Sequence, residues 1–215
     1  MEFNPAEVEA QDLYKLMTGL VVPRPIGWAS TLSPEGVHNL APFSFFIAIT
    51  PNPPHIAISI GKREGQTKDT LRNIQHHGEF VLNTVSTDLG LEMSGTAVEL
   101  PPEVSEFEAT GLTPVPSVAV KPMRVAEAPA HLECVSRQII PVDGPPYGAH
   151  LVIAEVVHIH VRDGLLLERN RIDLRKLNAV GRLAGDWYCT TTDQYEMARS
   201  LEPLKERLSG RTMRS

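Results

Sequence analysis

The order of apolar and polar positions along the chain predicts a protein built mainly of β-strands. Short apolar or alternating runs are separated by turns rich in proline and glycine, and few runs have the spacing of a long helix. The strands expected from this pattern are residues 26–31, 37–40, 44–50, 55–60, 79–85, 131–140 and 150–161.

Two turns are expected to join neighbouring strands. Residues 33–36 read Ser-Pro-Glu-Gly, in which the proline sets φ and the glycine accepts a positive φ, so they close a hairpin between the first two strands. Asp163-Gly164 is expected to close a second tight hairpin, between the strand 150–161 and residues 165–167.

Helical spacing is confined to short segments. Residues 7–20 place four apolar side chains on one face, and residues 69–77 place Leu71 and Ile74 on one face with Gly78 just past the end. The stretch 86–130 holds six prolines and is expected to be mostly loop, with a short helix near 89–96. The segment from about residue 195 is expected to be a helix or a frayed tail.

Seven or eight strands with one helix between them favour a closed antiparallel β-barrel over a parallel sheet. A length of 215 residues fits one domain, with two small domains as the alternative, and a C-terminal tail is expected at about 195–215. The chain contains neither a GxGxxG nor a GxxxxGK[ST] motif, so the sequence gives no support to a Rossmann dinucleotide site or a P-loop.

Composition narrows the classes of function. The chain is 42% apolar and 21% charged with a net charge of −6, and it has no basic block, so we expect no nucleic-acid partner. There is no apolar run of about 18 residues and no secretory signal, so we expect a cytoplasmic protein without a membrane partner. Cys134 and Cys189 lie far apart without CxxC spacing, which favours two reduced thiols.

The start of the predicted helix at residue 69 is the best candidate for a phosphate site. Unpaired N–H groups and a partial positive charge favour an anion there, and Lys68, Thr67 and Thr70 add a charge and hydroxyl donors. The alternative is that Asp69 or Thr67 only caps the helix while Lys68 is solvated.

Two segments before this helix are candidates for contacts with an aromatic ring. Ser30 and Thr31 end a strand, where their hydroxyls suit a ligand but also suit an ordinary turn. Residues 39–46 hold a proline that interrupts strand pairing and the aromatic residues Phe43, Phe45 and Phe46, which suit either a ring-binding wall or a barrel core.

Other polar residues are weaker candidates. His131 and His150 each begin a long strand, where an imidazole often reaches a cleft. His158 and His160 share one face of a strand but lack further ligands with metal-site spacing, so no metal is expected. The carboxylates of the proline-rich stretch, at positions 103, 106 and 108, are interpreted as solvated charge.

Taken together, these segments resemble the flavin reductase-like family of FMN-binding split-barrel proteins, in the branch that contains flavoredoxin and the reductase components of two-component monooxygenases such as nitrilotriacetate monooxygenase. The resemblance covers roughly residues 13–190. The residues that carry it are Pro23-Arg24-Pro25-Ile26, Ser30-Thr31, residues 39–46 (NLAPFSFF), Lys68-Asp69-Thr70 with Asn73-Ile74, Gly78-Glu79-Phe80-Val81 with Asn83, and His131-Leu132-Glu133-Cys134.

The resemblance implies a Greek-key split barrel, a homodimer and one FMN per subunit near the dimer interface. It also implies that His150 lies close to the flavin and the nicotinamide and supports catalysis. The residues that it implies for cofactor binding are Ala29, Ser30 and Thr31 beside the ring and ribityl phosphate, Ala41, Pro42, Phe43, Ser44, Phe45 and Phe46 along the ring, Ser59, Lys68, Asp69 and Thr70 around the phosphate, and Arg182 and Tyr188 near the flavin.

The function implied is an FMN-dependent NAD(P)H:flavin oxidoreductase, with NADH or NADPH as electron donor and a monooxygenase or another acceptor as partner. An electron carrier, a flavin-binding or storage protein, and a cofactor-free dimeric interaction module are the alternatives. Two departures from the family pattern, a late segment with less glycine (residues 182–188, RLAGDWY) and a longer proline-rich stretch, affect nicotinamide and substrate access more than FMN binding.

Overall fold

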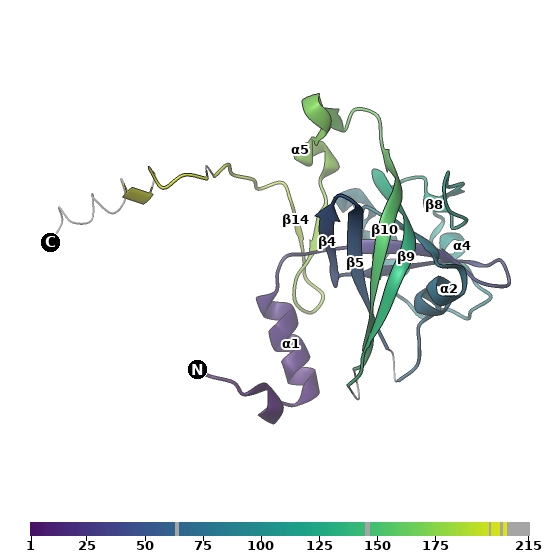
Figure 1. The fold of residues 1–215 in the computed structure, drawn as a ribbon, viewed down its shortest axis with the longest axis horizontal. Helices are drawn as coiled ribbons and strands as arrows, with labels where there is room; N and C mark the ends of the chain where they lie inside the picture. Colours follow the sequence, from purple (N-terminus) through teal and green to yellow (C-terminus); the bar gives the residue numbers. More distant parts are fainter. Residues whose placement is uncertain (63–64, 145–146, 198, 203, 206–215) are drawn as a thin grey trace.

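One antiparallel sheet of seven strands organises the molecule (Figure 1), in the order β3-β2-β6-β9-β10-β5-β4. The computed structural model describes residues 1–62, 65–144, 147–197, 199–202 and 204–205. The prediction of a mainly β fold with a few helices is confirmed. The strands of the large sheet are β2 (Gly27–Leu32), β3 (His38–Phe43), β4 (Phe46–Pro51), β5 (Pro54–Gly61), β6 (Glu79–Asn83), β9 (Ala130–Val142) and β10 (Ala149–Val161).

The connection between β3 and β4 forces this sheet to close. The two strands lie at opposite edges of the strand order, yet only Ser44 and Phe45 separate them in the chain. The three steps of chain from Phe43 to Phe46 span at most roughly 11 Å, so the sheet must curl until its edges come close together. The Ser59 N–H donates to the Phe45 carbonyl at 2.8 Å and ties the junction to β5. The result is an antiparallel barrel that is split between β3 and β4.

Two apolar cores lie on the two faces of β2. Ala29 faces the barrel interior, where Ile58 and Phe80 are buried. Trp28 faces an outer layer with Phe107 of α4 (Glu106–Thr110) and is completely buried. Burial on both faces explains why β2 shows a continuous run of buried positions instead of an alternation.

Short helices cover the barrel and its outer layer. α2 (Asp69–His77) has the predicted bounds and buries Leu71 and Ile74 in the barrel core, with Gly78 in the left-handed conformation at its end (φ 72°). α3 (Gly90–Gly95) follows the 3-10 turn Thr87–Leu89. α1 (Ala10–Leu20), preceded by the 3-10 turn Pro5–Glu7, lies outside the barrel (Figure 1). None of the helices in the described residues is long and apolar enough to span a membrane.

The region after β10 departs from the prediction of a second hairpin. β11 (Leu166–Leu167) pairs with β12 (Arg171–Ile172) and not with β10. The physical reason is that Leu165 is buried and its carbonyl accepts a bond from Asp173 N, 2.8 Å away, which leads the chain away from β10. A 3-10 turn (Glu168–Asn170) and α5 (Leu174–Leu177) complete this region, and the proline-rich stretch contributes a further pair, β7 (Pro114–Val115) with β8 (Arg124–Val125).

A small sheet of three strands stands beside the barrel, in the order β1-β13-β14. Its strands are β1 (Arg24–Pro25), β13 (Val180–Arg182) and β14 (Tyr188–Thr190). Beyond it, the predicted C-terminal tail leaves the barrel (Figure 1), and in its described part the Leu201 carbonyl accepts from Leu204 N at 3.1 Å and from Lys205 N at 3.0 Å.

Close packing within the small sheet gives a first prediction. A Cβ atom added at Gly181 would lie 2.8 Å from Cys189 Sγ and 2.9 Å from Pro23 Cβ, which is closer than real contacts allow. Gly181→Ala should therefore lower the free energy of unfolding by about 1–3 kcal/mol, measured by urea denaturation. Gly61→Ala is the matched control, because an added Cβ there meets nothing within 4 Å. Equal stability of the two variants would contradict the packing described for β1, β13 and β14.

Candidate functional site

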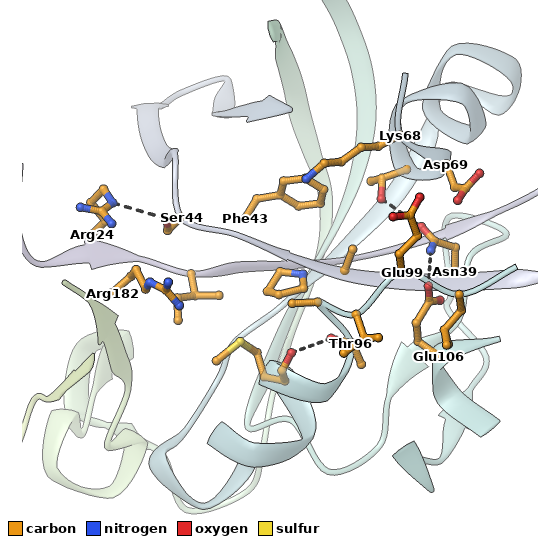
Figure 2. Close-up of a pocket in the computed structure, with 18 of the residues that line it drawn as sticks. Arg24, Asn39, Phe43, Ser44, Lys68, Asp69, Thr96, Glu99, Glu106 and Arg182 are labelled. Carbon is orange, nitrogen blue, oxygen red and sulfur yellow. Dashed lines mark hydrogen bonds between the residues drawn. The ribbon is translucent and has the colours of Figure 1, made fainter. Parts of the chain in front are cut away.

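A cleft of about 770 Å³ runs along β3. Its walls are β3, the first turn of α2, the segment that follows α3 and the β13–β14 hairpin (Figure 2). This volume lies within the range of roughly 300–1,000 Å³ that is typical of small-molecule and cofactor sites. The predicted site residues that line it are Ala41, Pro42, Phe43, Ser44, Lys68, Asp69, Thr70, Arg182 and Tyr188.

β3 forms the floor of the cleft because it is an edge strand. Its one hydrogen-bonded neighbour is β2, which makes Pro42 tolerable, since an edge position needs no ladder N–H. Phe43 is only 6% exposed and packs into the barrel core. The Lys68 ammonium lies 5.3 Å from the centre of the Phe43 ring, so the aromatic ring and the cation meet at the cleft wall.

The first turn of α2 presents an uncapped helix start. Lys68 stands at the N-cap position with extended backbone, and no side chain caps the helix. The alternative that Asp69 or Thr67 is the cap is therefore wrong. The Asp69 carboxylate contacts Arg72, and the Thr67 carbonyl accepts from Arg72 Nη1 at 2.5 Å. The Leu71 N–H donates to the Lys68 carbonyl at 3.0 Å, whereas the N–H groups of Asp69 and Thr70 have no acceptor recorded among the described residues and keep their capacity for an anion.

A buried hydrogen-bond network holds this helix start against β3. The Thr70 hydroxyl donates to Asn39 Oδ1 at 2.9 Å, and Asn39 Nδ2 donates to Glu106 Oε1 at 2.9 Å. The second oxygen of Glu106 accepts from the Leu40 N–H at 2.8 Å. One carboxylate thus fixes both the backbone of β3 and, through Asn39, the hydroxyl of Thr70 (Figure 2).

Glu106 was interpreted from the sequence as a solvated charge, and that interpretation is wrong. Its side chain is buried, with the residue only 7% exposed, and burial raises the pKa of its carboxyl above the usual range. The hydrogen bonds from Leu40 and Asn39 act in the opposite direction and stabilise the charged form. The carboxylate is a structural acceptor at the edge of the cleft.

Ala29, Ser30 and Thr31 lie outside the lining of the cleft. Ala29 is part of the barrel core, and the Ser30 hydroxyl donates to the Met123 carbonyl at 2.5 Å. Thr31 is fully buried beneath the helix start, where its hydroxyl accepts from Asn73 Nδ2 at 3.0 Å. The hydroxyls of Ser30 and Thr31 are thus bonded inside the protein, and a direct role of the three residues in cofactor binding stays a prediction.

The remaining predicted residues also lie outside the lining of this cleft. Phe45 is 47% exposed, whereas Phe46 packs against the barrel core. Ser59 and His150 sit on neighbouring strands, with Ser59 opposite Leu151. His150 Nδ1 is buried without a hydrogen-bond partner among the described residues. The catalytic role of His150 stays a prediction.

The far end of the cleft is formed by a buried arginine. Arg24 is 6% exposed, and its guanidinium donates to the carbonyls of Thr18 (2.5 Å), Val21 (2.8 Å) and Leu183 (2.9 Å) and to the Ser44 hydroxyl (3.4 Å). It therefore ties the end of α1, β1 and the β13–β14 hairpin together. Burial lowers the pKa of this guanidinium below its ordinary value.

A second arginine lies directly opposite the first. Arg182 of β13 is the register partner of Arg24 of β1. Its guanidinium carbon lies 4.5 Å from the centre of the Tyr188 ring, and it also contacts the Tyr188 hydroxyl and the Gly185 carbonyl. Figure 2 shows Arg24 and Arg182 at one side of the cleft, with Lys68 and Asp69 at the other.

Three residues that organise the site through hydrogen bonds, Arg24, Asn39 and Glu106, were not identified as site residues from the sequence. Arg24 had a signal, because a charge between two prolines beside an apolar strand is unusual in a buried segment. Asn39 had a weaker one, as the polar start of the segment that ends in Phe46. Glu106 had none, because nothing local distinguishes it from the acidic residues around it.

Comparison with known proteins identifies the family to which this fold belongs. A family model described as a flavin reductase like domain matches residues 18–174. The structure of nitrilotriacetate monooxygenase component B from Bacillus cereus is 37% identical, with a TM-score of 0.88, over 92% of this chain and 98% of that one. The 2-nitrobenzoate 2-nitroreductase NbaA of Pseudomonas fluorescens is 30% identical, with a TM-score of 0.85, over 93% and 96% of the two chains.

A third comparison concerns the fold alone. A protein from Shewanella frigidimarina NCIMB 400, described as a flavin reductase with a split barrel domain, has a TM-score of 0.81 at 24% identity, over 93% of this chain and 100% of that one. The predicted split-barrel fold is confirmed, in agreement with the gap between β3 and β4.

The buried carboxylate gives a prediction for this site. Glu106→Ala would leave the Leu40 N–H and the Asn39 amide without their acceptor, so it should lower the free energy of unfolding by about 2–3 kcal/mol. Glu103→Ala, in the same stretch but exposed, should change it by about 0.5 kcal/mol or less. Urea denaturation of both variants measures the difference, and similar values would show that Glu106 does not organise the network.

Proposed function

This chain belongs to the flavin reductase-like family, and from that premise we propose that it is an FMN-dependent NAD(P)H:flavin oxidoreductase. The observation that carries the proposal is the uncapped start of α2, beside Lys68 and Thr70, at one end of a cleft floored by β3. FMN combines a phosphate with a flat aromatic ring. A helix start with an ammonium and a hydroxyl suits the phosphate, and an edge strand with apolar side chains suits the ring.

The residues of the cleft divide the task of holding the cofactor. Lys68, Thr70 and the first-turn N–H groups of α2 would bind the phosphate. Asp69 does not oppose them, because its carboxylate is turned to Arg72 and is partly neutralised there. The segment from Ala41 to Ser44 would face the ring, in agreement with its position in the cleft lining.

The cofactor would supply the redox chemistry when bound, namely the acceptance of a hydride from a nicotinamide and the delivery of electrons to an acceptor. The protein would anchor the phosphate, orient the ring along β3 and limit the access of water. A monooxygenase is one acceptor supported by the 37% identical relative, which is named as a monooxygenase component. His150 keeps its predicted supporting role, and a cytoplasmic location stays a prediction.

A homodimer is part of the proposal. Phe45, Ile47 and Ile49, at and just before the edge strand β4, are between 47% and 62% exposed. Alternating exposed apolar residues on an edge strand are unfavourable in an isolated chain and typical of an interface. Light scattering coupled to size exclusion measures the molar mass, and a value of one chain, 23.7 kDa, would remove this part of the proposal.

The experiment that tests the function is an anaerobic visible spectrum of the FMN-reconstituted protein before and after the addition of NADH, and separately of NADPH. We expect at least one of the two donors to bleach the flavin absorption band rapidly after it is added. A firmly bound flavin that neither donor reduces would favour an electron carrier or a flavin store. Failure to bind FMN at all would refute the assignment of the cleft.

Lys68 provides a prediction for the phosphate end. Lys68→Gln removes a full charge close to the bound phosphate, so the dissociation constant for FMN should rise about tenfold or more. The dissociation constant for riboflavin, which has no phosphate, should change by less than about threefold. Lys176→Gln on α5 is the matched control and should leave both constants unchanged. The measurement is quenching of flavin fluorescence, and equal losses for FMN and riboflavin would contradict a phosphate contact.

A further inference from the structure

The cleft has a second cationic end that one bound FMN phosphate does not reach. The Asn39 side chain accepts from Thr70 at the helix start, and the Ser44 hydroxyl accepts from Arg24 at the other end. At about 3.3 Å per residue, the five steps of extended chain from Asn39 to Ser44 span roughly 16 Å. A phosphate bound at the start of α2 therefore leaves Arg24 and Arg182 without a counter-charge from it.

The hydrogen-bond partners recorded for the Arg24 guanidinium in the described part of the chain are all neutral. Its hydrogen bonds go to three backbone carbonyls and one hydroxyl, and no ion pair with a carboxylate is recorded for it within the described part of the chain. A buried cation without a counter-charge is costly. The nearby Arg182 adds to this cost, because like charges directly opposite each other across two antiparallel strands repel.

Arg182 is held in a position to bind a ligand. Stacking on the Tyr188 ring and the contacts with the Tyr188 hydroxyl and the Gly185 carbonyl fix the plane of the guanidinium. Arginine carries five N–H donors, and these contacts use two of them. The Asp186 carboxylate, 3.9 Å from Arg182 Nη2, is fully exposed to solvent and neutralises the charge only weakly.

We propose that the Arg24–Arg182 end of the cleft is a second anion subsite, which binds the phosphate or carboxylate group of the molecule that exchanges electrons with the flavin. Arg182 is the group that contacts this anion, and Arg24 is the buried charge that raises the local potential. The planar fork of Arg182 suits both oxyanions. This inference rests on the proposed function for the identity of the reactant, but the anion subsite itself rests on the two arginines.

The test is isothermal titration of the FMN-loaded protein with sodium pyrophosphate and, separately, with sodium benzoate, at constant ionic strength set with sodium chloride. Pyrophosphate represents the phosphates of a dinucleotide donor, and benzoate represents a carboxylate-bearing acceptor. We expect saturable binding of at least one anion, which identifies the source. Binding of neither anion to the FMN-loaded protein would overturn the proposal.

The variants locate the anion. Arg182→Gln should weaken anion binding about tenfold or more, and Arg182→Lys, which keeps the charge but loses the fork, should weaken it less. Arg175→Gln on α5 is the matched control and should bind as the parent protein does. FMN affinity should stay within about threefold in Arg175→Gln, and it is measured in both Arg182 variants so that a loss of cofactor is not read as a loss of the anion. Equal anion affinity in Arg182→Gln and the parent protein would refute the subsite.

These experiments distinguish a failure of the proposed function from a failure of the anion subsite. If the parent protein does not bind FMN, the proposed function fails. The same titrations on flavin-free Lys68→Gln protein, with and without Arg182→Gln, still decide the subsite, because the phosphate end is then weakened in both proteins. Thermal unfolding of each variant shows whether the β13–β14 hairpin stays folded, and the lysine variant supplies the comparison if the glutamine variant does not.

Discussion

The arrangement of the cleft depends on one buried carboxylate. Glu106 lies where water does not solvate it, so its two oxygens need donors from the protein, and the Leu40 N–H and the Asn39 amide supply them. These two hydrogen bonds join α4 to the edge strand β3. Because the side-chain oxygen of Asn39 accepts from the Thr70 hydroxyl, the same constraint places the start of α2 against that strand. The position of the end of the cleft that we propose to bind phosphate thus follows from the burial of a charge about thirty-five residues further along the chain, a separation that only the folded sheet bridges.

The closure of the barrel determines where a ligand fits. Joining the two edges of a seven-stranded sheet through Ser44 and Phe45 leaves β3 with one paired edge and one edge that faces the cleft. In a fully hydrogen-bonded barrel, that backbone would be occupied by a neighbouring strand. Here α2, the segment after α3 and the β13–β14 hairpin border it, and each contributes polar groups near an end or a turn. An open edge surrounded by element ends provides an apolar floor with polar groups at both ends.

The sequence predicted what local patterns determine and missed what depends on distant partners. The bounds of α2 were predictable, because the spacing of Leu71 and Ile74 and the glycine at position 78 lie within one segment. The partner of residues 166–167 was not, because the burial of Leu165 decides it. Glu106 was not predictable either, since its partner Leu40 is 66 positions away. The hydrogen bond from the Ser30 hydroxyl to the Met123 carbonyl was not predictable, because the two residues are 93 positions apart.

The two cationic ends of the cleft are built by different elements, so each can change in sequence without the other. The phosphate end is built by α2, α4 and β3, whereas the arginine end is built by α1, β1 and the β13–β14 hairpin. The two sets of contacts have no side chain in common, so a substitution at one end is expected to leave the hydrogen bonds of the other intact. If the proposed roles hold, affinity for the cofactor and the choice of a second reactant would be set by different residues. A change in the hairpin around Arg182 would then alter the reactant without rebuilding the start of α2, and a change around Thr70 would do the reverse.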